Sequence, residues 1–188
     1  LGRISRIAGE LGVTQNILMR ITPGVEADTF DAIRTGCEDS KFGFTVKDDF
    51  AFKCVKDALE AENVCLKGFH CHIGSQIFAL HSFEEAIEVM VNFLAKVKEA
   101  YGFEAEDLDM GGGLGIDYHH PNRVPVPDFK SYFATYARHL KLRKGQTLHF
   151  ELGRAVVAQC GSLITRVLYV KRGTFKQFAI VDAGMTDL

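Results

Sequence analysis

The stretch from Leu108 to Ile116 is a candidate ligand-binding turn, because a short apolar run there ends in three consecutive glycines, Gly111, Gly112 and Gly113. Glycine lacks a Cβ, so its backbone can approach a ligand closely and direct successive N–H groups at one anion. A strand that leads into such a turn is typical of a phosphate-binding site, and a helix starting there would add to the attraction. A tight strand exit that binds no ligand explains the same glycines equally well.

A second apolar run ends in the sequence H-C-H-I-G-S-Q at residues 70–76. Alternation along a strand places His70 and His72 on the same face. One interpretation is a metal pair, although the spacing supplies no third or fourth ligand. In a second, one histidine stacks on a planar cofactor while Ser75 and nearby amides bind its phosphate. A third is a pair of hydrogen-bonded histidines inside the fold.

Charged side chains follow two further predicted strands. In the E-L-G-R sequence at residues 151–154, the carboxylate of Glu151 can pair with a protonated heterocyclic nitrogen, and Arg154 can hold a carboxylate in two-point geometry. A local ion pair at a turn is the alternative for E-x-x-R. Asp182 is another acid at a strand end, whereas we interpret Lys41 as a structural or positioning residue, not an imine-forming lysine.

Hydrophobic spacing predicts the elements that position these residues. Helices are expected over residues 2–12, 48–59, 82–102 and 128–140. Strands are expected at residues 16–22, 42–44, 64–73 and 147–151 and just before the three glycines, with a loop over 25–39. Asp48 or Asp49 is expected to cap the second helix. Ser82 and Glu85 form a predicted capping box for the third, which Gly102 ends.

Alternation of strands and helices predicts an α/β fold with a parallel sheet. A TIM-type (β/α)8 barrel is favoured because the candidate residues fall at the carboxyl ends of strands, although a doubly wound sheet gathers ligands at the same edge. A whole barrel takes about 250 residues, so about five strands indicate a partial barrel. Residues 1–158 are the predicted barrel portion. In residues 159–188, strands over 163–170 and 177–181 follow each other without a helix between them, which predicts a hairpin or the start of a β-domain.

The composition argues against several classes of partner. A net charge of −2 gives no reason to expect nucleic acid or an anionic membrane surface. No apolar run approaches the roughly 20 residues that a membrane span needs. The five cysteines are scattered without a C-x-x-C pair, which argues against a disulfide framework and a structural zinc site. We therefore expect a cytoplasmic protein with no resident metal.

Six motifs, in this order, resemble the diaminopimelate decarboxylase family, pyridoxal-phosphate enzymes with an alanine-racemase-like barrel. They are R-I-T-P-G-V at Arg20–Val25, E-D-S-K-F-G at Glu38–Gly43, H-C-H-I-G-S-Q-I at His70–Ile77, G-G-G-L-G-I at Gly111–Ile116, E-L-G-R at Glu151–Arg154 and D-A-G-M-T-D-L at Asp182–Leu188. Each motif is weakly specific, but together they span nearly the whole chain at suitable intervals.

The resemblance implies a role for each candidate residue toward pyridoxal 5'-phosphate. His72 would stack on the ring, while Ser75 and the amides of Gly111–Gly113 would hold the phosphate. Glu151 would pair with the pyridine nitrogen and keep it protonated, so that the ring acts as an electron sink. Arg154 would bind a carboxylate of an amino-acid substrate. The implied reaction removes carbon dioxide from the D-configured centre of meso-diaminopimelate and gives L-lysine, in a homodimer.

The chain departs from the family pattern in three respects. Leu152 stands where the family usually has Pro. The imine-forming lysine of the family is expected upstream of Leu1, and the Cys, Tyr and Arg of its β-domain beyond Leu188. The chain thus resembles an internal fragment with strands four to eight, for which we expect no turnover alone. Alternatives are a related decarboxylase of arginine, ornithine or carboxynorspermidine, a non-catalytic relative that binds partners, and an unrelated phosphate-binding barrel.

Overall fold

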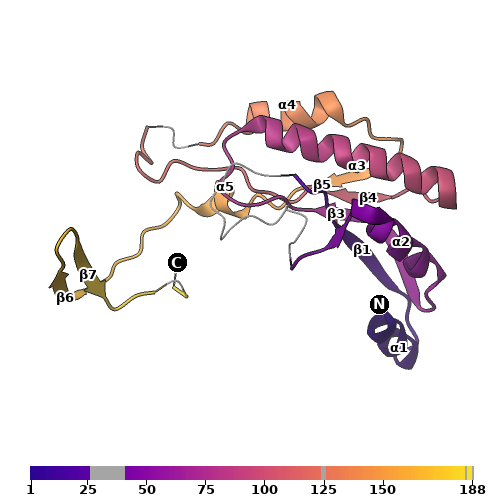
Figure 1. Ribbon diagram of the computed structural model, residues 1–188, viewed down its shortest axis with the longest axis horizontal. Helices are drawn as coiled ribbons and strands as arrows, with labels where there is room; N and C mark the ends of the chain where they lie inside the picture. The colour runs from indigo at the N-terminus through magenta and orange to yellow at the C-terminus, as the bar shows by residue number, and fades with distance from the viewer. Residues whose placement is uncertain (26–40, 124–125, 185, 188) are drawn as a thin grey trace.

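The computed structural model describes residues 1–25, 41–123, 126–184 and 186–187. It contains an α/β unit and a separate β-hairpin (Figure 1). The strands of the α/β unit are β1 (Gln15–Thr22), β2 (Phe44–Thr45), β3 (Val64–Cys71), β4 (Asp107–Asp109) and β5 (Thr147–His149). Its helices are α1 (Gly2–Glu10), the 3-10 turn η2 (Lys47–Asp49), α2 (Phe50–Glu60), α3 (Leu80–Tyr101), α4 (Phe129–His139) and α5 (Gly153–Val157).

All neighbouring strands of the main sheet are parallel, in the order β2-β1-β3-β4-β5. The two-residue strand β2 therefore lies on the outer edge of β1 and not between β1 and β3. The reason is that β1 already pairs with β3 from Gln15 to Ile21, so only its other edge is open to Phe44 and Thr45. The parallel α/β sheet confirms the predicted fold class, a partial TIM-type barrel, but its sequential strands are β1, β3, β4 and β5.

One face of this sheet is covered by helices and the other carries polar side chains. The helices α2 and α4 both pack against α3, and Figure 1 shows all three on the same side. A barrel has its helices outside, whereas a doubly wound sheet has helices on both faces, so this arrangement favours the barrel. Toward the helices the strands place buried residues: Met19, Ile21, Phe69, Cys71, Leu108 and Met110. The opposite face carries Arg20, His70, Asp107, Asp109 and His149.

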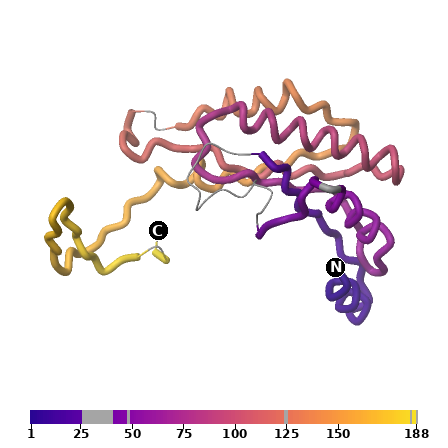
Figure 2. Tube along the Cα trace, viewed as in Figure 1, coloured from indigo at the N-terminus to yellow at the C-terminus, as the bar shows by residue number. Residues whose placement is uncertain are grey.

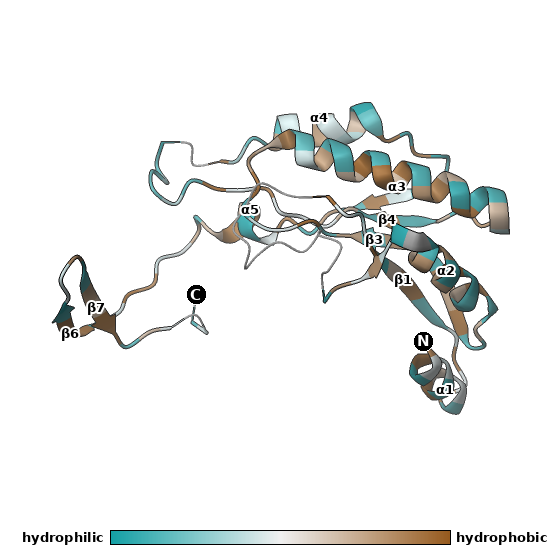
Figure 3. Ribbon diagram, in the orientation of Figure 1, coloured by the Kyte–Doolittle hydropathy of each residue, from teal (hydrophilic) through white to brown (hydrophobic). Residues whose placement is uncertain are grey.

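The long helix α3 is amphipathic, and Figure 3 shows hydrophobic and hydrophilic residues alternating along it. Its buried side includes Phe83, Ile87 and Met90, which follow the predicted spacing. Gly102 ends the helix in a left-handed conformation (φ 65°), as predicted. None of the helices in the described residues has the length and apolar character that crossing a bilayer requires.

The predicted capping box of α3 is wrong, and of the two candidates for α2 the structure describes the side chain of Asp49, which does not cap the helix. The helix α3 begins at Leu80, so Ser82 lies inside it, buried, and its hydroxyl has no hydrogen-bond partner in the described residues. Asp49 does precede α2, but its carboxylate accepts a hydrogen bond from Lys96 of α3 and caps no amide. In both cases packing against neighbouring elements decided where the side chain lies. By contrast Asp128 caps α4, accepting the N–H of Ser131 at 3.0 Å.

The C-terminal strands β6 (Val167–Arg172) and β7 (Gln177–Val181) form the predicted antiparallel hairpin. Figure 2 shows the extended segment after α5 leading from the sheet to this hairpin. Its apolar side chains are exposed, including Tyr169 and Phe178. The boundary between a barrel portion at 1–158 and a β-domain from 159 stays a prediction. The predicted loop residues 26–39 and the first three residues of E-D-S-K-F-G lie outside the described part of the chain.

Phe69 of β3 should be a large contributor to stability. Its ring is fully buried and meets Phe93 and Phe103 edge-on, with ring centroids 5.2 and 5.9 Å apart. We expect Phe69→Ala to lower the free energy of unfolding by about 3–5 kcal/mol, because the cavity left between sheet and helix cannot be refilled. Urea unfolding measures this, with the half-exposed Phe50→Ala as control. A loss from Phe69→Ala no larger than that of the control would contradict the prediction.

Candidate cofactor site

The three glycines bring the ends of three strands into close contact. A Cβ on Gly111 would lie 2.5 Å from the carbonyl oxygen of Cys71, at the end of β3. A Cβ on Gly112 would lie 2.1 Å from the carbonyl oxygen of Glu151, just after β5. Gly111 and Gly113 also have positive φ angles, of 65° and 108°, which side chains disfavour. The glycines therefore have a structural reason to be there, independent of any ligand.

Two of the three glycine amides have acceptors inside the protein. The N–H of Gly111 donates to Oδ1 of Asp109 at 2.8 Å, and that of Gly112 donates to Nδ1 of His72 at 3.2 Å. For the N–H of Gly113, the described residues supply no acceptor. Of the three amides predicted to bind phosphate, that of Gly113 is thus the one whose hydrogen is not already used.

Ser75 is held beside Gly113 by a short parallel pairing between the two loops. The N–H of Ile77 donates to the carbonyl of Gly113, and the carbonyl of Ile77 accepts the N–H of Gly115, both at 2.9 Å. The side-chain amide of Gln76 adds two hydrogen bonds of 2.9 Å to the backbone of Ile116. Gln76 has a positive φ of 62°, a conformation that these two bonds help to maintain. The sequence reasoning missed this role of Gln76.

Arg154, from the first turn of α5, reaches the same place. Its Nε donates to Oγ of Ser75 at 2.9 Å, and one terminal N–H group donates to the hydroxyl of Tyr118 at 2.6 Å. A guanidinium has five N–H donors in a planar fork, so others remain for an anion. The predicted phosphate ligand Ser75 and the predicted carboxylate ligand Arg154 are therefore direct neighbours, although 79 positions apart in the sequence.

Glu151 lies at the carboxyl end of β5, with its backbone fixed by the glycine turn. Its N–H donates to the carbonyl of Gly111 at 2.7 Å, and its Oε2 lies 3.3 Å from Nε2 of His70. Burial lowers the pKa of Arg20, on the same face of the sheet, and the negative charge of Glu151 opposes this by acting to raise it. His70, Asp109 and Glu151 bring one polar atom each within 4.8 Å of one another.

The surroundings of the His72 imidazole favour its neutral form. Burial lowers its pKa, and the nearby charges of Arg20 and His70 lower it further, against the opposing effect of Glu151. A neutral ring accepts the N–H of Gly112 at Nδ1, as the structure has it. A neutral, half-buried imidazole at a strand end is suited to stacking against a flat cationic ring.

The depressed pKa of His72 has a consequence for stability. Below its ordinary pKa of 6.5, the unfolded chain binds this proton more readily than the folded chain, so stability rises with pH in a window that ends near 6.5. We expect the wild-type protein to lose more free energy of unfolding than His72→Asn between about pH 7.5 and about pH 5.5. The Asn oxygen can still accept the N–H of Gly112, which makes the variant conservative. Equal losses in the two proteins would refute the assignment.

Two further side chains from the sequence analysis are Asp182 and Lys41. Asp182 accepts hydrogen bonds from Thr165 and Arg166 within the hairpin region, so its role in the described structure is local. The ammonium of Lys41 lies over the ring of Phe42, 5.2 Å from its centroid, and the guanidinium of Arg20 lies over the same ring at 4.6 Å. The structural role of Lys41 stays a prediction.

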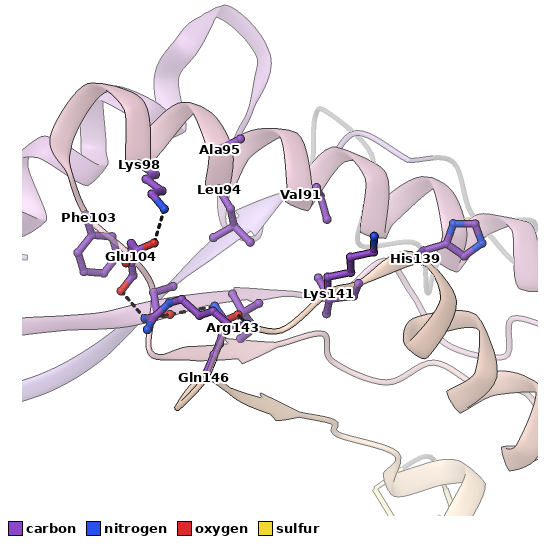
Figure 4. A pocket seen from close by; sticks show the side chains of 13 residues that line it. Val91, Leu94, Ala95, Lys98, Phe103, Glu104, His139, Lys141, Arg143 and Gln146 are labelled. Atoms are coloured by element: carbon purple, nitrogen blue, oxygen red, sulfur yellow. Dashed lines mark hydrogen bonds and ion pairs between the residues drawn. The ribbon is translucent and has the colours of Figure 1, made fainter.

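A groove on the helical side of the sheet is separate from the cluster (Figure 4). It lies between α3 and the segment joining α4 to β5, and includes Leu94 and Phe103 among its apolar lining. Its charges are engaged locally: Lys98 pairs with Glu104 at 2.6 Å, and Arg143 donates to the carbonyl of Glu104 at 3.0 Å. We interpret this groove as part of the packing between helices and sheet.

Comparison with known proteins agrees with this geometry. Residues 1–158 match the family model described as "Pyridoxal-dependent decarboxylase, pyridoxal binding domain". The diaminopimelate decarboxylase of Bacteroides thetaiotaomicron is 55% identical over 185 residues, covering 98% of this chain and 47% of the relative. That of Vibrio cholerae is 39% identical over 188 residues, covering 100% of this chain and 44% of the relative. The chain thus spans about half the length of the curated relatives it matches.

Solved structures give the same result. The crystal structure of diaminopimelate decarboxylase from Helicobacter pylori complexed with L-lysine is similar with a TM-score of 0.77 and 34% identity, covering 97% of this chain and 44% of that one. The structure of the enzyme from Methanocaldococcus jannaschii has a TM-score of 0.74 and 36% identity, with coverage of 98% and 43%. The predicted cofactor, pyridoxal 5'-phosphate, is thereby confirmed. The chain belongs to the pyridoxal-dependent decarboxylases and contains much of their pyridoxal-binding domain.

Proposed function

We propose that this chain acts within a decarboxylase that converts meso-2,6-diaminopimelate to L-lysine and carbon dioxide. The observation that carries the proposal is the convergence of His72, Ser75, Glu151 and Arg154 around one glycine turn, at the carboxyl edge of a parallel sheet. The choice of substrate is supported by the relatives, which are diaminopimelate decarboxylases at up to 55% identity. The Helicobacter pylori structure holds L-lysine, the product of the proposed reaction.

The described residues fit pyridoxal 5'-phosphate in their chemistry. At one end of the cluster, the hydroxyl of Ser75 and the amide of Gly113 are donors suited to a phosphate, and the guanidinium of Arg154 lies beside Ser75. At the other end, Glu151 supplies a carboxylate for a protonated ring nitrogen. His72 lies between these two ends, linked to Gly112 of the turn. A Cβ at Gly113 would lie 2.5 Å from the carbonyl oxygen of Gly74, so the two loops can approach each other this closely only with glycine.

Each residue has a separate role in the proposed reaction. The cofactor, when bound, supplies an electron sink for the electron pair left as carbon dioxide departs. Glu151 keeps the ring nitrogen protonated through its negative charge, which is what makes such a sink effective. His72 fixes the plane of the ring by stacking, and Ser75 with Gly113 anchors the phosphate. Arg154 binds a substrate carboxylate with the donors that Ser75 and Tyr118 leave available.

We further propose that the full-length enzyme is a cytoplasmic homodimer whose imine-forming lysine lies outside this chain. The chain spans 47% of the relative from Bacteroides thetaiotaomicron and 42% of that from Methanocaldococcus jannaschii, so other parts of such an enzyme would complete the site. Among the described residues, none of the hydrogen bonds or ion pairs joins a lysine to Glu151 or Arg154. We therefore expect borohydride treatment with pyridoxal phosphate to leave no stoichiometric adduct on the 188-residue chain alone.

The test of the proposed function is a substrate panel on the full-length enzyme, with carbon dioxide release and product identity as readouts. Preference for meso-diaminopimelate over arginine, ornithine and carboxynorspermidine is expected. Preference for one of those three would overturn the substrate, and failure to bind pyridoxal phosphate at all would overturn the proposal itself.

Arg154→Lys keeps the positive charge but loses the planar fork of guanidinium N–H donors, so it should raise KM for diaminopimelate more than it weakens cofactor binding. The reverse result would place Arg154 on the phosphate instead.

A further inference from the structure

His70 lies next to Glu151 but has no role in the function proposed so far. It stands opposite Asp109 in the register of β3 and β4, and Asp109 stands opposite His149 of β5. Glu151 is two residues beyond His149, so alternation places it on the same polar face. Nε2 of His70 lies 3.3 Å from Oε2 of Glu151. The His70 side chain is only 15% exposed, whereas that of Glu151 is 57% exposed.

The Glu151 side chain needs a partner to hold one orientation. Its backbone is fixed through the carbonyl of Gly111, but a largely exposed carboxylate keeps several rotamers open. Within the described ranges, the hydrogen bond to His70 is the side-chain contact recorded for this carboxylate. An ionised carboxylate only accepts hydrogen bonds, so Nε2 of His70 must be the donor. Oε1 of Glu151 is then left for a second donor.

The negative charge of Asp109 is the reason that the Glu151 carboxylate needs a hydrogen-bond donor to keep its orientation. The Asp109 carboxylate lies in the same cluster, within 4.8 Å of both other side chains, and one of its oxygens already accepts the N–H of Gly111. Two carboxylates so close repel each other, and the repulsion would turn the exposed side chain of Glu151 outward toward solvent. The hydrogen bond from Nε2–H of His70 to Glu151 opposes that movement.

We propose that His70 is a positioning residue, whose Nε2–H holds one oxygen of Glu151 so that the other faces the ring nitrogen of the cofactor. This inference rests on the proposed function, because it assigns to Glu151 the pairing described there. His70 acts only through Glu151 and touches neither substrate nor the reacting atoms. It belongs to β3, a strand paired on both sides, and so gives the exposed acid a rigid support.

A divalent metal ion bound by His70, Asp109 and Glu151 is the competing explanation of the same cluster. One imidazole and two carboxylates are acceptable ligands for several metals. The positioning role is favoured because Asp109 already accepts a backbone N–H, and because Glu151 cannot serve a metal and the ring nitrogen with the same oxygen. Metal content therefore forms part of the test.

The test is a double-mutant cycle on the full-length enzyme, with the dissociation constant of pyridoxal phosphate as the readout. His70→Leu removes the donor and should weaken cofactor binding by about 10–100-fold, the range typical of removing an outer-shell partner. H70Q carries an amide N–H in place of Nε2–H and should recover most of the affinity. In the Glu151→Ala background, His70→Leu should have little further effect, since its action passes through Glu151.

The matched control is His149→Leu, which also removes a histidine–carboxylate pair from this face of the sheet. Nε2 of His149 pairs with Oδ1 of Asp107 at 2.9 Å and not with Glu151. This variant should leave cofactor affinity within a few-fold of wild type. Wild-type affinity in His70→Leu, or additive losses in the double variant, would overturn the positioning role while the proposed function stands. A stoichiometric metal in the purified enzyme, lost in both H70L and E151A, would also overturn it. Absence of cofactor binding in the wild type would overturn the proposed function and this inference together.

Discussion

Replacing Glu151 by Gln in the full-length enzyme is expected to lower kcat/KM by about 10²–10⁴-fold, the range associated with losing a positioned proton-handling group. The amide keeps the size of the side chain but carries no negative charge. A protonated ring nitrogen then loses its counter-charge, while Arg20, on the same face, adds unfavourable positive charge. The ring nitrogen is expected to lose its proton, and the electron sink weakens with it.

Steady-state kinetics and the absorption spectrum of bound cofactor measure this effect separately from folding. Glu106→Gln is a suitable control, because Glu106 forms an exposed ion pair with Lys67 at 2.9 Å and lies at the opposite end of β4 from the glycine turn. Exposed pairs of this kind contribute little to stability, so the control should keep nearly full activity. If E151Q retained activity within tenfold of wild type, the pairing assigned to Glu151 would be wrong.

The second large effect is expected from Gly112→Ala. The new Cβ would lie 2.1 Å from the carbonyl oxygen of Glu151 and 2.8 Å from its carbonyl carbon, and both are backbone atoms that cannot rotate away. The turn and the end of β5 must separate by a distance on the order of 1 Å, and a misplacement of that size can cost roughly 100-fold in rate. Forcing extra volume into this contact should also cost about 1–3 kcal/mol of stability.

Gly112 is informative because steric contact there is separable from backbone strain. Gly111 and Gly113 have positive φ angles, so alanine at either position is strained even without a neighbour. The control is Gly161→Ala, where a Cβ meets nothing within 4 Å and φ is not positive. Cofactor affinity, kcat/KM and urea unfolding would be measured on both variants. Normal affinity and activity in G112A would mean that the glycine turn does not set the position of Glu151.

The amino-acid sequence by itself determined most of the local structure. Apolar spacing in α3 and α4, the C-terminal glycine Gly102 and the alternating strand β3 carry enough local preference to fix element type. The two C-terminal strands were also evident from local patterns. So was the position of the candidate site residues at the ends of strands. The motifs also indicated the decarboxylase family, because residue types and their order do not depend on knowing the contacts.

Tertiary structure alone decided which groups meet. The short strand β2 took the outer edge of β1 because β3 already occupied the other edge. Ser82 became a buried helix residue because Phe83 and Ile87 pack α3 onto the sheet from an earlier start. Asp109 and His70 each lie two residues before a predicted site residue, so strand alternation places them on the same face as that residue. The sequence does not indicate which groups they contact.

The physical reason is the distance along the chain. The hydrogen bonds from His70 to Glu151 and from Arg154 to Ser75 join residues 81 and 79 positions apart, and they depend on strand register and on how closely backbones approach. Register is set by the summed packing of whole strands and helices, which no local pattern contains. The glycine turn illustrates both levels: its residue types are evident in the sequence, but only the folded chain shows that two of its amides serve Asp109 and His72.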